Sequence, residues 1–182
     1  MLRTKDILDE KDPRVRAKNT DVDFPLNDEY KDIIPEMLKH LRYSQIEKLS
    51  KKYDLRPGMG LAAPQLGINK NFFVVCYEVK DGVFDDYILI NPEVISYSEE
   101  MIYAGEGEGC LSVNREVEGI VPRHARITVE AYDLDGNKRK YRVREDLAIA
   151  FQHELDHLNG ILFVDYIDPK DPYKNADLYR EI

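Results

Sequence analysis

Five consecutive residues carry the clearest chemical pattern in the chain: His153, Glu154, Leu155, Asp156 and His157, an HExxH sequence. Residues four apart on an α-helix leave nearly the same face, so the two imidazoles can hold one metal ion. Glu154 lies one position round the helix, where it can take a proton from a reacting water without being a ligand. This pattern indicates metal-assisted hydrolysis. The plainer alternative is two hydrogen-bonded helical histidines beside surface acids.

Two histidines leave the coordination of a metal incomplete, and no third ligand follows them. In the longer zinc-protease signature, a glycine lies three residues after the second histidine and a third histidine three further on. Gly160 fits this pattern, but Phe163 occupies the histidine position. The only later glutamate is Glu181, the penultimate residue, which we expect to be frayed. The third ligand must therefore lie upstream.

Cys110 is the upstream candidate. It lies in the glycine-rich segment AGEGEGCLS, residues 104–112, whose sharp turns could set a thiolate against the helix. Zn²⁺ or Fe²⁺ keeps a bound thiol deprotonated, so one cysteine, two histidines and one water complete a set of four ligands. The other cysteine, Cys76, lies inside the apolar run FFVVCYEV, and we interpret it as a small core residue.

Three helices are predicted to position these residues. Residues 145–160 begin with acids, carry apolar residues at helical spacing and end at Asn-Gly, which predicts a capped, largely buried helix that bears both histidines. An earlier helix follows the N-cap candidate Asn27, with a kink or a late start at Pro35. A short helix covers residues 44–53. The glycine-rich residues 58–67 resemble a loop whose backbone approaches another group closely.

Strands are predicted on both sides of the cysteine segment. Residues 71–79 and 87–95 are rich in β-branched and aromatic side chains, and the pairs Asp-Gly and Asp-Asp between them are typical of turns. The segments RITVEAYD and NKRKYRV flank Asp135-Gly136, which predicts a hairpin. Short strands followed by one apolar helix indicate an α+β fold, with mostly antiparallel sheets packed around a central HExxH-bearing helix.

The composition excludes several classes of protein. The chain of 182 residues has a net charge of −9 and 43% hydrophobic residues, which favours one globular domain over residues 1–182. The acidic charge argues against a specific nucleic-acid partner or an anionic membrane surface. No apolar run approaches the roughly 20 residues needed to span a bilayer, and no targeting signal precedes the domain. Two cysteines rule out a disulfide scaffold and fit a reducing compartment, so we expect a cytoplasmic protein.

Three segments together resemble a known family. In this order, GMGLAAPQ, EGCLS and QHELDHLNG are similar to the signature motifs of the peptide deformylases, metal hydrolases that remove the formyl group from the N-terminal methionine of new bacterial polypeptides. The resemblance runs from about Arg14 to Ile167, and no motif departs from the family's pattern. The insertion-like stretch IEKLSKKYDLRP and the short tail after Asp168 resemble the longer-loop class known from Gram-positive bacteria.

The resemblance implies a metal centre. Cys110, His153 and His157 would hold one divalent metal ion, and Glu154 would act first as general base and then as general acid. The ligand types alone accept Zn²⁺, Fe²⁺, Ni²⁺ or Co²⁺. The resemblance implies Fe²⁺ in the cell, with the other metals replacing it in purified protein.

The resemblance also implies how the substrate is held. The side-chain amide of Gln65 and the backbone N–H of Leu111 would stabilise the oxyanion, although Gln65 could instead cap a turn. Ile149 and Ala150 share the helical face of His153, and they could line a pocket for the methionine side chain or be ordinary core residues. The residues expected to contact substrate are Met59, Gly60, Gly109, Ile149 and Ala150.

Some expectations concern supporting residues and partners. Arg123 and Glu108 could pair and brace the cysteine loop, and Asp156 could either support an imidazole or be solvated. His40 and His124 are interpreted as structural. The substrates implied are N-formylmethionyl nascent peptides, and the mixed-charge tail after Asp168 predicts at most a weak, transient ribosome contact.

Two other functions fit part of the pattern. A metallopeptidase that cleaves internal peptide bonds would use the same HExxH chemistry. A non-catalytic protein could use the cysteine and the two histidines as a structural metal site. Structural zinc usually takes four protein ligands, and the sequence offers no fourth.

Overall fold

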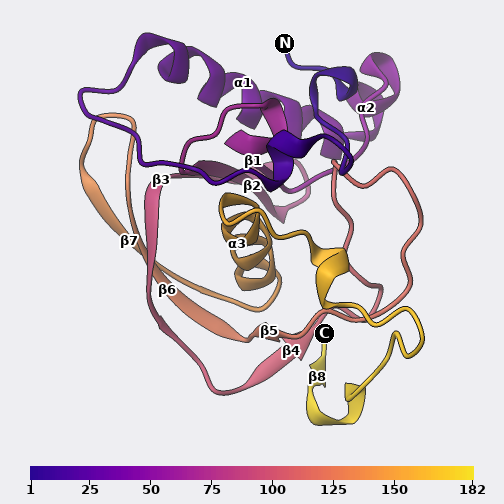
Figure 1. The fold of residues 1–182 in the computed structure, drawn as a ribbon. Helices are drawn as coiled ribbons and strands as arrows, with labels where there is room; N and C mark the ends of the chain where they lie inside the picture. The colour runs from indigo at the N-terminus through magenta and orange to yellow at the C-terminus, as the bar shows by residue number, and fades with distance from the viewer.

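Helix α3 (Glu145–Leu158) lies at the centre of the molecule and carries both histidines of the HExxH pattern (Figure 1). The computed structural model describes residues 1–182. A five-stranded antiparallel sheet curves around α3. In spatial order its strands are β1 (Gly60–Ala62), β2 (Phe72–Lys80), β3 (Val83–Tyr97), β6 (Arg126–Tyr132) and β7 (Lys138–Arg144). The predicted α+β fold with mostly antiparallel sheets around the HExxH-bearing helix is confirmed.

The other two helices, α1 (Asp28–Gln45) and α2 (Glu47–Tyr53), lie on the far side of β1 and β2 from α3 (Figure 1). The predicted cap of α1 is confirmed, because the side chain of Asn27 accepts a hydrogen bond of 2.9 Å from the backbone N–H of Glu29. The helix continues without a break through Pro35. The expected late start at Pro35 is therefore wrong.

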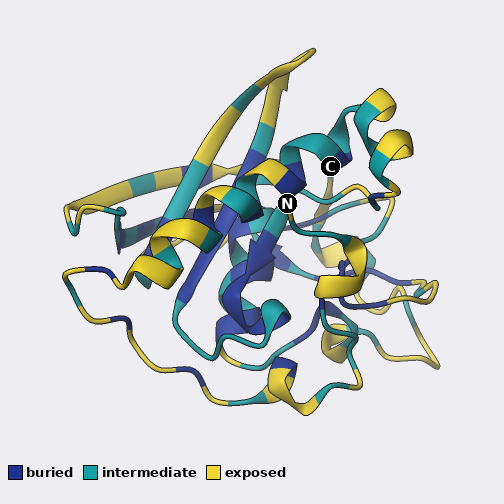
Figure 2. Cartoon of the chain, turned by 90° about the horizontal axis from the view of Figure 1, so that it is seen from above, coloured by how far each residue is buried: buried dark blue, intermediate teal, exposed yellow.

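Strand β2 separates the two main parts of the core. Phe72, Val74 and Cys76 pack with α1, whereas Phe73 and Val75 pack with α3. Because successive side chains in a strand point to opposite faces, a strand covered on both sides needs an apolar residue at every position. This explains the unbroken apolar run, and it confirms Cys76 as a core residue. Figure 2 shows the buried residues gathered in this interior, with exposed residues around it.

A smaller sheet covers one end of α3. Its order is β5 (Arg123–His124), β4 (Met101–Tyr103) and β8 (Arg180–Glu181), and β8 runs parallel to β4 (Figure 1). Glu181 is held in this sheet rather than frayed, since the hydroxyl of Tyr103 donates a 3.0 Å hydrogen bond to its carboxylate. The expectation of a frayed end was wrong, because a position near the end of the sequence does not reveal the pairing of β8 with β4.

The predicted hairpin at Asp135-Gly136 joins β6 to β7 and is confirmed. Two other expectations need correction. The glycine-rich residues 58–67 are not a simple loop, because Gly60–Ala62 pair with β2 and Ala63–Leu66 form a 3-10 helix. The Asp-Asp pair at residues 85–86 lies inside β3, so the turn between β2 and β3 is made by the Asp-Gly pair alone.

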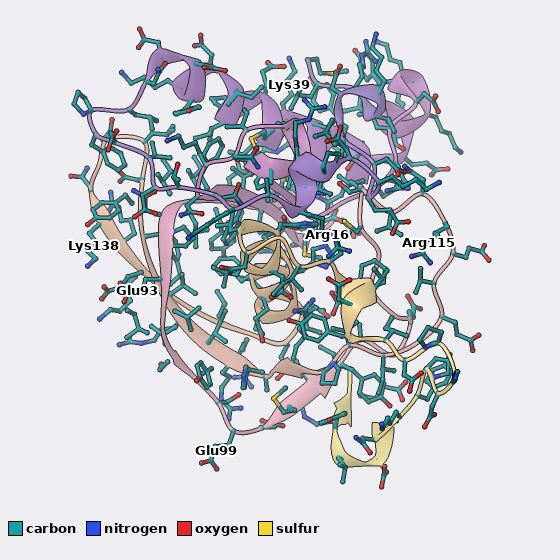
Figure 3. The ribbon with its side chains drawn as sticks, in the orientation of Figure 1. Arg16, Lys39, Glu93, Glu99, Arg115 and Lys138 are labelled. Carbon is teal, nitrogen blue, oxygen red and sulfur yellow. The ribbon has the colours of Figure 1, made fainter.

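Charged side chains lie on the outside of this framework. Glu93, Glu99 and Lys138 are exposed and point away from the ribbon (Figure 3). None of the helices combines the length and the apolar character that crossing a bilayer requires.

Candidate active site

Helix α3 buries both apolar side chains that pack in the core and polar side chains that could take part in chemistry. Ala148, Phe151 and Leu158 belong to the same core cluster as Phe73 and Val75 of β2. Three polar side chains of the helix are also buried, only 9%, 3% and 1% exposed: His153, Glu154 and His157. The i, i+4 spacing therefore places both imidazoles together, as the sequence predicts.

The loop after β4 brings Cys110 to the two histidines. The Sγ atom of Cys110 lies 3.3 Å from Nε2 of His157, and one donor atom from each of Cys110, His153 and His157 lies within 4.8 Å of the others. Two donors bound to one tetrahedral zinc-sized ion, at about 2.0–2.3 Å each, are about 3.5 Å apart. The spacing and the sulfur–nitrogen donor set both fit a single divalent metal. Burial lowers the pKa of His157 well below its ordinary value, which favours the neutral imidazole that a metal ligand requires.

A buried network orients His153. The carboxylate of Glu108 lies 2.8 Å from Nδ1 of His153, which leaves Nε2 directed at the cluster of donors. Arg123 donates two hydrogen bonds of 2.9 Å to the same carboxylate and one of 2.5 Å to Asp156. Burial alone raises the pKa of Glu108, but the hydrogen bonds from His153 and Arg123 outweigh it, and the net pKa is lowered.

The predicted pairing of Arg123 with Glu108 is thus present, and it is bidentate. Asp156 is not simply solvated, because it forms an ion pair with Arg123. It supports an imidazole only indirectly, through Arg123 and through Glu108, which lies against Nδ1 of His153. Gly160 and Phe163 supply no ligand. Phe163 instead stacks on the ring of His153 with centroids 6.0 Å apart.

Glu154 occupies a buried position beside the donors. Burial raises the pKa of its carboxyl to about 7, and the nearby charges of His153 and Arg123 oppose this only in part. One of its oxygens, Oε2, is buried without a hydrogen-bond partner. A Cβ atom at position 60 would lie 2.3 Å from the other oxygen, Oε1. Gly60 is therefore required to make room for the carboxylate.

This burial predicts how pH affects the chelator-treated protein. The carboxyl of Glu154 has a higher pKa in the folded than in the unfolded state. Its contribution to the free energy of unfolding is therefore fully present only below the unfolded pKa, and it is lost as pH rises through the folded pKa. With an increase from 4.5 to about 7, charged Glu154 costs about 3 kcal/mol at pH 8. Metal-free Glu154→Gln should be more stable than metal-free wild type by that amount at pH 8, with no difference near pH 4. Urea unfolding at both pH values measures this; a constant difference would contradict the prediction.

Gln65 caps a turn, as one of its two interpretations predicts, and its other end lies next to Cys110. Its Oε1 accepts a 2.9 Å hydrogen bond from the backbone N–H of Ala62, which caps the turn. Its Nε2 donates to the hydroxyl of Ser112 at 3.0 Å and lies 3.6 Å from Sγ of Cys110. The capped turn fixes one end of the amide, so the N–H group is held next to the thiol. Ser112 is a contact that the sequence did not predict.

A cavity of about 470 Å³ opens onto these groups. Of the predicted site residues only His157 is absent from its lining, which includes Met59, Gly60, Gln65, Gly109, Cys110, Leu111, Ile149, Ala150, His153 and Glu154. Arg56 and Asp146 also line it and were not predicted. Arg56 donates to the backbone carbonyls of Cys110 and Val113, and its place two residues before the first motif was the available signal. His40 and His124 lie outside this lining.

The site combines a buried carboxylate with a Cys-His-His donor set at one cavity, on an HExxH helix enclosed by antiparallel sheet. These features define a protein of the mononuclear metal-hydrolase class. The model of the polypeptide deformylase family matches residues 4–173. The chain belongs to this family.

Individual relatives agree over nearly the whole chain. A peptide deformylase of Macrococcus caseolyticus is 49% identical over 175 residues, which cover 96% of this chain and 95% of that protein. Peptide deformylase 2 of Bacillus anthracis is 45% identical and covers 97% and 96%, respectively. A solved structure of a probable peptide deformylase from Synechococcus phage S-SSM7 has a TM-score of 0.73 and 34% identity, over 88% of this chain and 98% of that chain. The Thermotoga maritima enzyme has a TM-score of 0.69 and 33% identity, over 90% and 97%.

Proposed function

We propose that this protein is a metal-dependent peptide deformylase that removes the N-formyl group from the N-terminal methionine of newly made polypeptides and releases formate. The observation that carries the proposal is the buried carboxylate of Glu154 beside the donors of Cys110, His153 and His157, at one cavity. Membership of the deformylase family supports the same reaction. We further propose that residues 1–182 act as a single catalytic domain.

The Cys110, His153 and His157 donors would hold the metal, for which we propose Fe²⁺ in the cell. Zn²⁺, Ni²⁺ or Co²⁺ fit the same donors and would be found in purified protein. When bound, the ion supplies a Lewis acid that polarises the formyl carbonyl and makes a water more acidic. Metal analysis of protein prepared without oxygen tests the assignment of iron.

Glu154 would move the proton. Burial raises the pKa of its carboxyl in the metal-free protein, and a bound divalent cation would oppose that increase and favour the carboxylate that accepts a proton from water. Glu154 would take a proton from the attacking water and deliver it to the nitrogen of the methionine as the bond from formyl carbon to nitrogen breaks. The products are formate and a free methionyl amine.

The oxyanion would be stabilised by the side-chain amide of Gln65 and the backbone N–H of Leu111. Both residues line the cavity next to Cys110, and the amide of Gln65 is held in place by its bond to Ala62. A preorganised donor of this kind contributes about 3 kcal/mol to transition-state stabilisation. The amide of Gln65 would already be in place before the charge develops, which limits the reorganisation needed during the reaction.

The rest of the cavity would receive the methionine and the peptide after it. We propose that Met59, Ile149 and Ala150 contact the thioether side chain, and that the backbones of Gly60 and Gly109 contact the peptide. All five residues line the cavity. A partly apolar pocket lined by fixed polar groups is typical of a site for a small, specific ligand.

Formate release from formyl-Met-Ala-Ser tests the proposed function. We expect turnover of the formylated peptide and no cleavage of unformylated Met-Ala-Ser or of longer internal peptide bonds. Activity on the unformylated peptides alone would instead identify a metallopeptidase. Stoichiometric metal without either activity would identify a structural metal site.

Gly60→Ala should lower kcat for formyl-Met-Ala-Ser at least tenfold while the protein keeps its metal. The added Cβ would lie 2.3 Å from Oε1 of Glu154, so the carboxylate must move. A displacement of about 1 Å in a reacting group costs up to about 10²-fold in rate. Gly82→Ala is the control for kcat, because Gly82 lies in an exposed turn outside the cavity and a Cβ there meets no atom within 4 Å. Its positive φ of 73° makes the change cost stability but not activity. Equal kcat values for the two variants would contradict the prediction.

Partners and location follow from the same proposal. N-formylmethionyl nascent peptides would be the substrates, in the bacterial cytoplasm where they are made. We propose only a weak, transient contact with the ribosome and no specific nucleic acid, because the chain has a net charge of −9. Co-sedimentation with ribosomes that is lost on deletion of residues 168–182 would contradict a weak contribution from that segment.

A further inference from the structure

Strand β8 pairs with the strand that leads into the cysteine loop. β4 continues directly into the segment that carries Glu108 and Cys110. Beyond the paired residues, the backbone N–H of Ile182 donates to the carbonyl of Tyr103 at 3.0 Å, and the N–H of Gly105 donates to the carbonyl of Ile182 at 2.9 Å. The first turn of the cysteine loop is thus fixed to the segment that follows β8.

Gly105 provides independent support for this fixed contact. A Cβ atom at this position would lie 2.3 Å from Oε1 of Glu181 in β8. The hydroxyl of Tyr103 binds the same carboxylate at its other oxygen. The start of the loop is therefore closely fitted to β8, and a larger side chain at position 105 would push the two apart.

The side chain of Ile182 lies behind the wall of the cavity. It packs against a small apolar cluster made by Ile102, Ala125 and Ile149, together with Ala104. Two members of this group, Ala104 and Ile149, also line the cavity. Ile182 therefore packs against the cluster to which the cavity-lining residue Ile149 belongs, and it is not itself part of the lining.

Arg180 connects β8 to the other element of this wall. Its guanidinium donates two hydrogen bonds, of 2.8 and 3.0 Å, to the carboxylate of Glu145, the first residue of α3. It also donates one of 2.8 Å to Glu100 just before β4. Exposed ion pairs of this kind contribute little to stability, but they link β8 to the start of α3 and to the residue before β4. The apolar packing of Ile182 is the contact that links this segment to the cluster behind the cavity.

We propose that Ile182 is a positioning residue that sets the width of the pocket for the N-terminal side chain of the substrate. It acts by holding Ile149 and Ala104 in place and does not itself touch the reacting atoms. The proposal rests on the proposed function, which assigns Ile149 to the methionine pocket. It adds a specificity role to a segment outside the motifs that carry the chemistry.

The test compares wild type with Ile182→Val and Ile182→Ala on formyl-Met-Ala-Ser and formyl-Gly-Ala-Ser. Ile182→Ala should raise KM for the methionyl peptide about fivefold, with kcat changed less than about twofold, because a loosened apolar wall weakens side-chain binding. Ile182→Val should give an intermediate KM. The glycyl peptide has no side chain to place, so its KM should stay the same in all three proteins.

Binding of the product-like peptides Met-Ala-Ser and Gly-Ala-Ser, measured by calorimetry, provides a readout that needs no turnover. Ile182→Ala should lower the ratio of their affinities about fivefold. A lower kcat with unchanged KM, or an unchanged affinity ratio, would overturn the proposal and leave Ile182 a stability residue only. Wild type that binds Met-Ala-Ser but releases no formate would contradict the proposed function, while the affinity ratio would still decide the role of Ile182.

Leu178→Ala is the matched control. Leu178 lies in the same segment as Ile182 and is 68% exposed, so its truncation removes an apolar side chain without loosening the cavity wall. It should leave KM, kcat and the affinity ratio unchanged. An effect of Leu178→Ala equal to that of Ile182→Ala would also overturn the proposal, because it would show that the whole segment responds without specificity.

Discussion

Glu154→Gln should lower kcat for formate release from formyl-Met-Ala-Ser about 10³-fold while the protein keeps one metal ion per chain. Glutamine has nearly the same shape as glutamate and fits the space left by Gly60, but it cannot accept the proton of the attacking water. The donor atoms of Cys110, His153 and His157 are unaffected, so metal binding should persist. The measurements are a coupled formate assay and metal analysis of the same preparation.

Two outcomes would contradict this role for Glu154. Full turnover by Glu154→Gln at unchanged metal content would show that another group moves the proton. Loss of the metal together with the activity would show that the carboxylate acts as a ligand. Glu99→Gln is the control, because Glu99 is exposed and points away from the molecule (Figure 3). It should match wild type in both measurements.

The parts of the fold that could be predicted are those whose signal is local. The helix at residues 145–158 has acids in its first turn, apolar residues at helical spacing and an Asn-Gly end, and all three lie within one segment. The hairpin at Asp135-Gly136 is equally local. β1 was missed because its three residues lie in a glycine-rich segment and become a strand only through pairing with β2. Glu181 was misjudged for the same reason, since β8 exists only beside β4.

In the candidate site, too, the residues placed by a local pattern could be predicted and most contacts between distant segments could not. Spacing within one helix placed His153 and His157 together, and the glycines around Cys110 pointed to a thiolate that could reach them. Apart from the pairing of Arg123 with Glu108, the supporting contacts between distant segments could not be derived, because no local period relates them. Asp156 binds Arg123, which lies 33 residues earlier, and Gln65 binds Ser112, which lies 47 residues later. These contacts orient the ligands, so the sequence predicted the reacting groups better than their support.

Removing Arg123 from the buried network around Glu108 should lower both the stability of the protein and its affinity for the metal. Arg123→Met should lower the free energy of unfolding by about 3 kcal/mol and weaken metal binding at least tenfold. Arg123 and Glu108 are only 3% and 4% exposed, and methionine fills similar volume without the charge. The variant leaves the carboxylate of Glu108 buried with His153 as its remaining hydrogen-bond partner, and Asp156 loses its ion pair. Urea unfolding and competition with a metal chelator measure the two effects.

A control variant at an exposed arginine and a double variant test whether these effects come from the buried charge of Glu108. Arg126→Met removes an arginine that is 52% exposed and pairs with Glu100, so it should cost less than about 1 kcal/mol. Adding Glu108→Gln to Arg123→Met removes the unpaired charge, so the double variant should lose less stability than the sum of the two single changes. Strict additivity would show that the two residues are not energetically coupled. Unchanged metal affinity in both single variants would show that the network stabilises the fold without orienting His153.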